Sequence, residues 1–387
     1  MTMATKNDIC NKYLNEYLKA SKPRKGEILD IITEVTGLHR KAVIRKLKRL
    51  QLKGSMPGKR GRKAIYGPEV IMALKDIWQA ASEVCGELLH PVVYEYIDIL
   101  TRDDMWDHSD RATKQLKEMS LGTMKRKVGT FKKAGRKRKG LSATKPSSLK
   151  ALIPVFNGPW DDKPPGFGQI DTVVHCGHTL LGDMVYTLNY TDAATLLSIP
   201  RAQWNKGQAA TRNSMIAIKK RMPFNWLGAH PDTGSEFINK FMVDWCQLNN
   251  IELSRSRPGK KNDNMYVEER NGHVVRKFVG YKRLDCPEAV DALNAVYDVL
   301  TPYLLHFITV RRTLKKEKIK SKYRRTYEKQ PKTPYQRILE HPEVSAEVKK
   351  KLKREHEKLN PLVLKRKIDQ RLKLLYDSQK GCGQSNS

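Results

Sequence analysis

The stretch that decides the fold is GFGQIDTVVHCG, residues 166–177, in which one carboxylate, Asp171, stands among apolar and β-branched residues. β-Branched residues favour strands, and glycines bound the run, so we predict a strand here. A strand that buries Val173 and Val174 has no packing need for an acid in its middle. Asp171 is therefore the first candidate functional residue.

The residues around this strand alternate between strand and helix patterns. We predict further strands over 183–194, 195–202, 225–232 and 251–258, and helices over 207–222, 235–250 and 262–280. The order βββαβαβα predicts a mixed five-stranded sheet with helices packed on its faces. Residues 152–310 are accordingly predicted to form one α/β domain, and their apolar stretch over 289–310 to be an amphipathic helix.

Two more acids stand at informative places in this domain. Asp232 follows the fourth strand in HPDTGSEF (230–237), Glu268 lies on the last helix in DNMYVEERN (263–271), and 35 residues separate them. Three such carboxylates can converge, and they repel one another unless a cation neutralises them; hard oxygen ligands select Mg²⁺ or Mn²⁺. Two ions about 3.5–4 Å apart can activate a nucleophile and stabilise the leaving oxygen of a phosphodiester. We predict that Asp171, Asp232 and Glu268 are catalytic metal ligands.

Each acid also has a purely structural explanation. Asp171 can cap a turn, Asp232 can start a helix, and Glu268 can be a solvated helix acid. Three histidines of the domain are interpreted as structural or supporting residues, because two-metal phosphoryl transfer needs no histidine; they are His175, His178 and His230.

The composition points to a polyanionic partner. The 387 residues include 74 Lys and Arg against 41 acids, a formal charge of +33. Such a charge attracts nucleic acid, while 39% hydrophobic residues exclude a fully disordered basic protein. No secretory signal or membrane span is indicated, so we expect a cytoplasmic, nucleoid-associated protein without a membrane partner. The six scattered cysteines indicate neither a disulfide framework nor a zinc site.

Residues 1–55 are predicted to be a helix-turn-helix DNA-binding domain with a turn at Gly37. The apolar residues of its first helix are Ile28, Leu29, Ile32 and Val35, and the predicted inward residues of its second helix are Val43, Ile44, Leu47 and Leu50. The predicted DNA contacts on its basic second helix are Arg40, Lys41, Arg45, Lys46 and Arg49. An ordinary helical hairpin with a solvated basic face is the alternative. Residues 56–67 form a basic linker, in which Arg60 and Arg62 are predicted to follow the phosphate backbone.

Residues 68–133 are predicted to be a second helix-turn-helix-like domain, with Ser120 as an N-cap and Lys125, Arg126 and Lys127 as DNA contacts. A basic linker over 134–151 follows. Residues 311–387 form a basic, mainly helical region with 24 Lys and Arg against 9 acids. Its run RRTLKKEKIKSKYRRTYEK (311–329) is either a flexible phosphate-binding arm or disordered.

Taken together, IDTVVH, HPDTGSEF and DNMYVEERN, with the 35-residue spacing, resemble the catalytic core of DDE transposases and retroviral-type integrases. The resemblance spans roughly residues 155–310 and implies an RNase H-like fold. It further implies a transposase of the bacterial insertion-sequence or phage-like type, which binds terminal repeats, hydrolyses the transposon end and joins its 3′-OH to target DNA. Two Mg²⁺ ions, replaceable by Mn²⁺, double-stranded DNA and a homo-oligomer are the expected partners.

The family often has a basic residue seven positions after the glutamate. Here that position is Val275, and Arg276 and Lys277 follow. We predict Arg276 and Lys277 as DNA contacts despite this departure from the family pattern. Lys260 and Lys261, in the loop before the catalytic helix, are candidates to grip DNA, an ordinary solvated loop being the alternative.

Two other functions use the same residues. A metal-dependent nuclease would cut without joining, and a transposase-derived regulator would only bind DNA. Strand-joining products distinguish the first from a transposase, and the intact acid triad weighs against the second.

Overall fold

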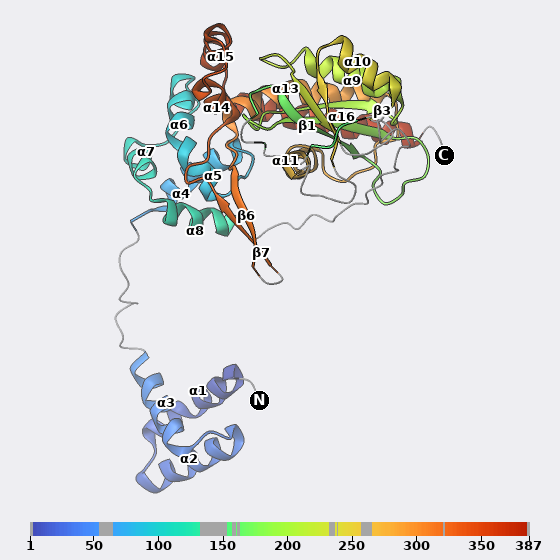
Figure 1. Cartoon of the computed structure of the whole chain (residues 1–387). Helices are drawn as coiled ribbons and strands as arrows, with labels where there is room; N and C mark the ends of the chain where they lie inside the picture. The colour runs from blue at the N-terminus through green and yellow to red at the C-terminus, as the bar shows by residue number, and fades with distance from the viewer. Residues whose placement is uncertain are drawn as a thin grey trace. The chain divides into compact units, whose positions relative to one another are not determined.

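The computed structural model describes residues 3–53, 65–131, 153–156, 160, 163–231, 237, 239–256, 265–319 and 322–384. The chain forms two compact units, Met1–Ile65 and Tyr66–Ser387, and each is described by itself (Figure 1).

The first unit contains three helices, α1 (Met3–Lys19), α2 (Lys22–Thr36) and α3 (Arg40–Lys53). Gly37, with φ of 63°, ends α2 in the left-handed conformation, as a glycine turn requires. The buried core consists of Cys10, Ile28, Leu29, Ile32, Val43 and Leu47.

One core prediction in this unit was wrong. Ile44, predicted to be inward, is 39% exposed, and Val35 of the apolar pattern on the first predicted helix is 50% exposed. The physical reason is α1, which was not predicted separately and contributes Cys10 to the core. It packs on both α2 and α3 and so selects which of their apolar residues are covered.

The second unit contains the predicted mixed five-stranded sheet, with helices on its faces. Its strands are β1 (Phe167–Val174), β2 (Val185–Asp192), β3 (Ser198–Trp204), β4 (Gly228–Pro231) and β5 (Glu252–Leu253). The strand order is β3-β2-β1-β4-β5. β1, β2 and β3 pair antiparallel, whereas β4 runs parallel to both β1 and β5. This confirms the predicted order of strands and helices.

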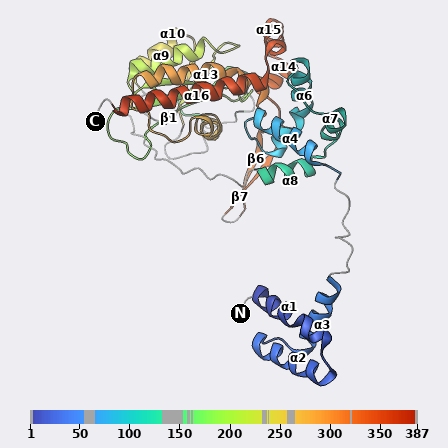
Figure 2. The ribbon, with the colours of Figure 1, turned by 180° about the vertical axis from the view of Figure 1, so that it is seen from behind.

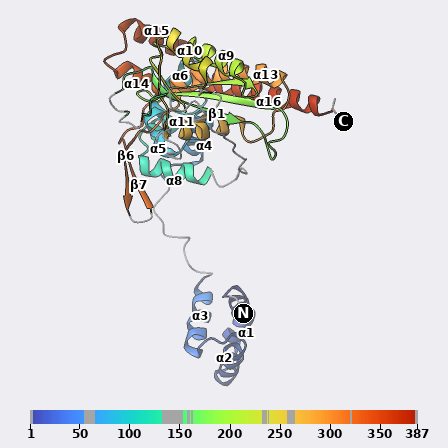
Figure 3. The same cartoon turned by 45° about the vertical axis from the view of Figure 1, so that its right-hand side comes forward.

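Different helices cover the two faces of the sheet. α9 (Gln208–Lys219) and α10 (Lys240–Leu248) cover the face that carries Ile170 and Leu188. The opposite face packs against α11 (Met265–Arg270), a π-helix (Asn271–Arg276), α12 (Lys277–Val279) and α13 (Glu288–Phe307). Figure 3 shows α9 and α10 on one side of β1 and α11 on the other. Because strand residues alternate, Gln169, Asp171 and Val173 all face α11.

A helical lobe precedes the sheet. Its elements are α4 (Pro68–Ala80), α5 (Gly86–Leu89), a 3₁₀-helix (His90–Val92), α6 (Val93–Arg102), α7 (Asp110–Lys117) and α8 (Leu121–Phe131). Its apolar side chains share one core with α13 and with α16 (Pro361–Gln384), which lies alongside α13 (Figure 2). Tyr303 on α13 donates to the carbonyl of Ala80 at 2.6 Å and contacts Ser82 at 2.8 Å. Residues predicted as separate domains over 68–133, 152–310 and 311–387 thus contribute to a common core; the boundaries stay predictions.

The basic run from residue 311 is a β-hairpin. Antiparallel β6 (Thr313–Ile319) and β7 (Lys322–Tyr327) pair with each other, so the run does not have the structureless character we expected. Its Thr, Ile and Tyr residues favour strands and outweigh the charge repulsion in forming the ladder. α14 (Pro334–Glu340) and α15 (Ala346–Lys358) follow.

None of the helices in the described ranges is long and apolar enough to cross a membrane. Among the cysteines, Cys10, Cys85, Cys176 and Cys246 are free thiols, whereas Cys286 takes part in a disulfide.

Candidate functional site

The candidate site lies between β1 and α11, on the face of the sheet that α11 covers. The fully buried Gln169 accepts hydrogen bonds from the backbone N–H groups of Tyr266 and Val267, at 2.9 and 3.1 Å. The first N–H groups of a helix have no partner within that helix. A side chain of the central strand therefore holds the beginning of the helix that carries Glu268.

One turn further along, Asn271 fixes the carboxylate of Asp171. Its Nδ2 donates to Oδ2 of Asp171 at 2.7 Å, while its Oδ1 accepts from Nδ2 of Asn189 at 2.8 Å. Asn189 is the register partner of Asp171 on β2. The other oxygen of Asp171, Oδ1, accepts from the Thr172 N–H at 2.8 Å. The partly buried carboxylate thus has a defined orientation.

Arg276 makes a third connection between the helix and β1. Its guanidinium donates to the Val174 carbonyl at 2.7 Å and lies over the Tyr281 ring at 5.0 Å. Burial lowers the pKa of Arg276 from its usual value. The side chain predicted as a DNA contact therefore also holds the end of the π-helix against β1.

The direction of Glu268 follows from its neighbours on the helix. Arg270 donates to Ser198 on β3 at 3.1 Å, and Asn271 contacts β1 and β2. Successive residues of an α-helix are rotated by 100° about its axis, so Arg270, Asn271 and Glu268 follow one another around the helix in that order. Arg270 lies toward β3 and Asn271 toward β2 and β1. Glu268 therefore lies toward the next strand of the sheet, β4. Glu268 is an exposed residue of the first turn of α11.

β4 ends next to Asp171. Its last residue, Pro231, pairs in register with Ile170, the residue before Asp171. Asp232, the next residue in sequence, lies outside the described residues. Within the described part of the chain, no three His, Cys, Asp or Glu side chains are grouped to hold a metal ion. The described carboxylates of the predicted set, Asp171 and Glu268, have the oxygen chemistry that Mg²⁺ and Mn²⁺ prefer.

The histidines have structural surroundings, in line with their interpretation. His175 is fully buried, its Nε2 lies 2.8 Å from Oγ1 of Thr187, and burial lowers its pKa to about 3. His230 is 1% exposed, and its Nδ1 lies 3.0 Å from Oγ of Ser254. His178 is exposed.

A buried acid of the same sheet shows what a structural carboxylate looks like. Asp192, at the end of β2, accepts hydrogen bonds from the backbone N–H groups of Gly166 and Thr195, both at 2.7 Å. The hydroxyls of Thr195 and Tyr190 donate to it as well, at 2.7 and 3.2 Å. Burial nevertheless raises the pKa of Asp192. Its oxygens are engaged in closing the turn after β2.

The predicted DNA contacts fall into three groups. On α3, Lys41, Arg45 and Arg49 are exposed and Lys46 is half-buried, whereas Arg40 pairs with Asp30. On α8, Arg126 is exposed, Lys127 is half-buried and Lys125 pairs with Glu87 at 2.6 Å. Arg60, Arg62, Lys260 and Lys261 lie outside the described residues, and Arg276 and Lys277 are half-buried on the helix that follows Glu268.

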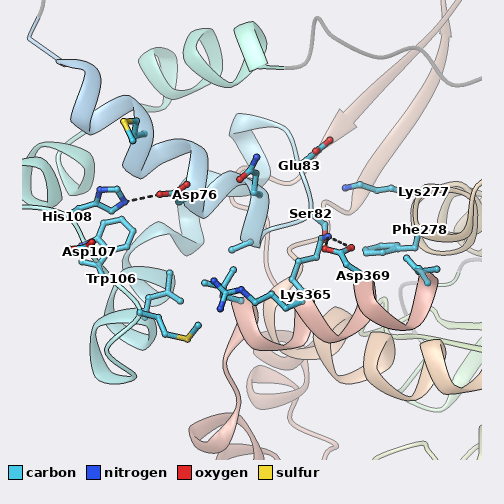
Figure 4. A pocket seen from close by; sticks show the side chains of 18 residues that line it. Asp76, Ser82, Glu83, Trp106, Asp107, His108, Lys277, Phe278, Lys365 and Asp369 are labelled. Carbon is cyan, nitrogen blue, oxygen red and sulfur yellow. Dashed lines mark hydrogen bonds and ion pairs between the residues drawn. The ribbon is translucent and has the colours of Figure 1, made fainter. Parts of the chain in front are cut away.

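Lys277 lines a cleft of about 890 Å³ between the helical lobe and α16 (Figure 4). Two ion pairs lie in this cleft: His108 contacts Asp76 at 3.0 Å, and Lys365 pairs with Asp369. Neither Asp171 nor Glu268 lines it. The cleft is therefore separate from the acid site.

Sequence reasoning missed the residues that orient the acids, namely Gln169, Asn189 and Asn271. Two of them carried a usable signal: Gln169 is two residues from Asp171 on the same strand face, and Asn271 is three residues from Glu268 on the same helix side. Asn189 became recognisable only from the strand register.

Comparisons with known proteins give one close relative in sequence. No protein-family model matches this chain. The uncharacterized protein y4rM of Sinorhizobium fredii is 33% identical over 311 residues, which cover 78% of this chain and 86% of that protein.

Two solved structures are similar at low identity. The HTLV-2 integrase catalytic core domain in complex with magnesium (dimeric form) is 13% identical, with a TM-score of 0.27, over 38% of this chain and 90% of that one. The catalytic core domain of BIV integrase is 14% identical, with a TM-score of 0.29, over 44% of this chain and 91% of that one.

Proposed function

This chain belongs to the same family as the uncharacterized protein y4rM of Sinorhizobium fredii, and we propose its function from its own site. It is a DDE-type transposase or integrase with an RNase H-like core. It binds the terminal repeats of a mobile DNA element, hydrolyses the phosphodiester at the element's end and joins the resulting 3′-OH to target DNA.

One observation carries the proposal. The helix that bears Glu268 is bonded to the strand that bears Asp171, through Gln169 at its beginning and Asn271 one turn later. β4, the strand directly before Asp232, ends beside Ile170. A structural acid would not need this arrangement, as Asp192 illustrates.

In the proposed site, Asp171, Asp232 and Glu268 hold two Mg²⁺ or Mn²⁺ ions. When bound, such ions activate an attacking oxygen and neutralise charge on the leaving oxygen. Asn271 and the Thr172 N–H keep the Asp171 carboxylate in one orientation, so less freedom is lost when a cation and DNA bind. His175 stays neutral near neutral pH and takes no part in proton transfer.

The two reactions balance without a nucleotide cofactor. In the first, a water oxygen bonds to phosphorus and the bond to the 3′-oxygen breaks, which leaves a 3′-OH. In the second, that 3′-OH forms a new phosphodiester while the target strand releases its own 3′-oxygen. One phosphodiester forms for each one broken in the joining step.

The basic helices supply the binding of DNA. The exposed cations of α3 and α8 are proposed to contact phosphates and to read the repeat. Since two element ends must be brought together, at least two subunits are expected on DNA.

A joining assay tests the proposal. Labelled duplexes that contain the ends of the chain's own element are incubated with a supercoiled target and Mg²⁺ or Mn²⁺. Joined products are expected from the natural chain and not from Glu268→Gln. Cutting without joining would make the protein a nuclease, and binding with neither reaction would make it a regulator.

A further inference from the structure

The β6–β7 hairpin is the most strongly basic element that the proposed function leaves unused. Its two strands carry six Lys and Arg residues and one acid, Glu317. At about 3.4 Å per residue, the ribbon is roughly 20 Å long. Figure 1 shows it projecting from the body of the second unit.

The ribbon has little cover from the rest of the chain. β6 and β7 pack chiefly against each other. Leu314 is 59% exposed, and Arg324, Arg325 and Tyr327 are exposed as well. An isolated two-stranded ribbon is only marginally stable in water. Its charges and its free faces therefore both point to a partner.

The strand register adds a second argument. Along the backbone it pairs Arg324 with Glu317 and Arg325 with Lys316. Consecutive residues of a strand point to opposite faces, so the exposed Arg324 and Arg325 put positive charge on both faces of the ribbon. A polyanion that surrounds the ribbon therefore meets a cation on each face.

The base of the hairpin, in contrast, is firmly attached near the candidate site. Arg312 donates to the Ala193 carbonyl at 3.0 Å, and its backbone N–H donates to Glu328 at 2.8 Å. Val310 shares a small buried cluster with Ala193 and with Tyr266, two residues before Glu268. The ribbon thus starts beside the beginning of α11.

We propose that the β6–β7 hairpin inserts into the major groove of double-stranded DNA and holds the duplex on the Asp171–Glu268 site. The B-DNA major groove, about 12 Å wide, admits a two-stranded β-ribbon. This proposal rests on the proposed function in one respect only, namely that the polyanion is DNA.

The test measures DNA binding without catalysis. The full chain is titrated in EDTA against a fluorescent duplex at several salt concentrations, and the slope of log K against log salt is determined. Arg324→Gln/Arg325→Gln should flatten the slope by about 2, because each phosphate contact contributes about 0.9. Arg324→Lys/Arg325→Lys keeps both charges and should keep the slope.

The matched control removes two exposed charges elsewhere in the same unit. Lys353 and Arg354 lie on α15, at the end of the unit away from the hairpin in Figure 1. Lys353→Gln/Arg354→Gln should leave the slope unchanged. Equal flattening by both pairs, or by neither, would overturn the proposal.

An RNA duplex of the same length tests the groove. The major groove of A-form RNA is deep and too narrow for side chains to read, so the hairpin substitutions should change binding to DNA and not to RNA. An equal change on both duplexes would show a backbone clamp instead of groove insertion. Since no reaction occurs in EDTA, a failed joining assay leaves this result unaffected, and the reverse also holds.

Discussion

β1 and the β6–β7 hairpin both carry charged side chains on strands, but the surroundings of those side chains differ. On β1, Asp171 has hydrogen bonds from Asn271 and from the Thr172 N–H, all supplied by the chain. On the hairpin, Arg324 and Arg325 are exposed to solvent. The chain itself therefore holds the Asp171 carboxylate in one orientation, whereas the two arginines are accessible to an external partner. The following experiments test this contrast.

The largest effect is expected on β1. Asp171→Asn should reduce cleavage and joining by more than about 100-fold, because changing a residue that only supports a metal ligand already costs about 10–100-fold. Rates of end cleavage under single-turnover conditions measure this. The comparison is Asp192→Asn, which should cost about 1–3 kcal/mol of stability and leave the folded protein active. Comparable loss of activity in both variants would contradict the assignment of Asp171.

The second effect concerns the attachment of α11. Gln169→Leu leaves two backbone N–H groups of the helix without their acceptor and should lower stability by about 1–3 kcal/mol. It should also slow cleavage about 10–100-fold, as loss of an orienting residue does.

Gln203 offers the matched control, because it is a buried glutamine of the same sheet that contacts Thr211 and Asn205 instead of α11. Gln203→Leu should be destabilised to a similar extent without the kinetic defect. If both variants retain full rates, Gln169 does not position the site.

The third effect is a pH dependence of stability. Burial depresses the pKa of His175 from 6.5 to about 3 in the folded protein. The unfolded chain therefore binds a proton that the folded chain excludes between these values, and stability falls as the pH is lowered through this window. The contribution is about 1.4 kcal/mol per pH unit.

Urea unfolding from pH 7 to pH 4 measures this slope. His175→Gln, which cannot take up the proton, should show a shallower dependence by about that amount. Parallel curves for the two proteins would refute the assignment.

The smallest effect is expected in the hairpin. Arg324→Gln/Arg325→Gln should change the free energy of unfolding by no more than about 0.5 kcal/mol, as exposed substitutions usually do. Denaturant unfolding of the DNA-free protein tests it, and a loss above 1 kcal/mol would show that the ribbon is held by packing.

The same contrast explains how much the sequence predicted. The strands and their order along the chain follow from the alternation of apolar residues and from the glycine positions. Burial of the sheet requires this alternation, so β1 to β5 were predictable. Asp171 stood out because a carboxylate in an apolar strand is unusual, and the roles of Asp171, Asp232 and Glu268 stay predictions. The role of Asn189 depends on the strand register and on a side-chain bridge to Asn271, a distant residue in the sequence, and no local pattern reveals it.

Other differences have similar physical causes. The sequence of α1 is mostly polar and gives no sign that Cys10 is buried, and so Ile44 was assigned to the wrong face. The hairpin was not predicted, because a dense run of basic residues is as typical of an unfolded arm as of a β-ribbon. In both cases tertiary contacts decide what local composition leaves open.

The π-helix at Asn271–Arg276 has a consequence for comparing this chain with others. A π-turn closes a hydrogen bond to the fifth residue instead of the fourth, and so uses one residue more than an α-turn. Positions after it are displaced by one in sequence but not in space. Arg276, eight residues after Glu268, therefore occupies the place that an uninterrupted α-helix gives to the seventh. A residue-by-residue alignment of this helix with an uninterrupted one needs a single gap, and without it Val275 is matched to a position that Arg276 fills.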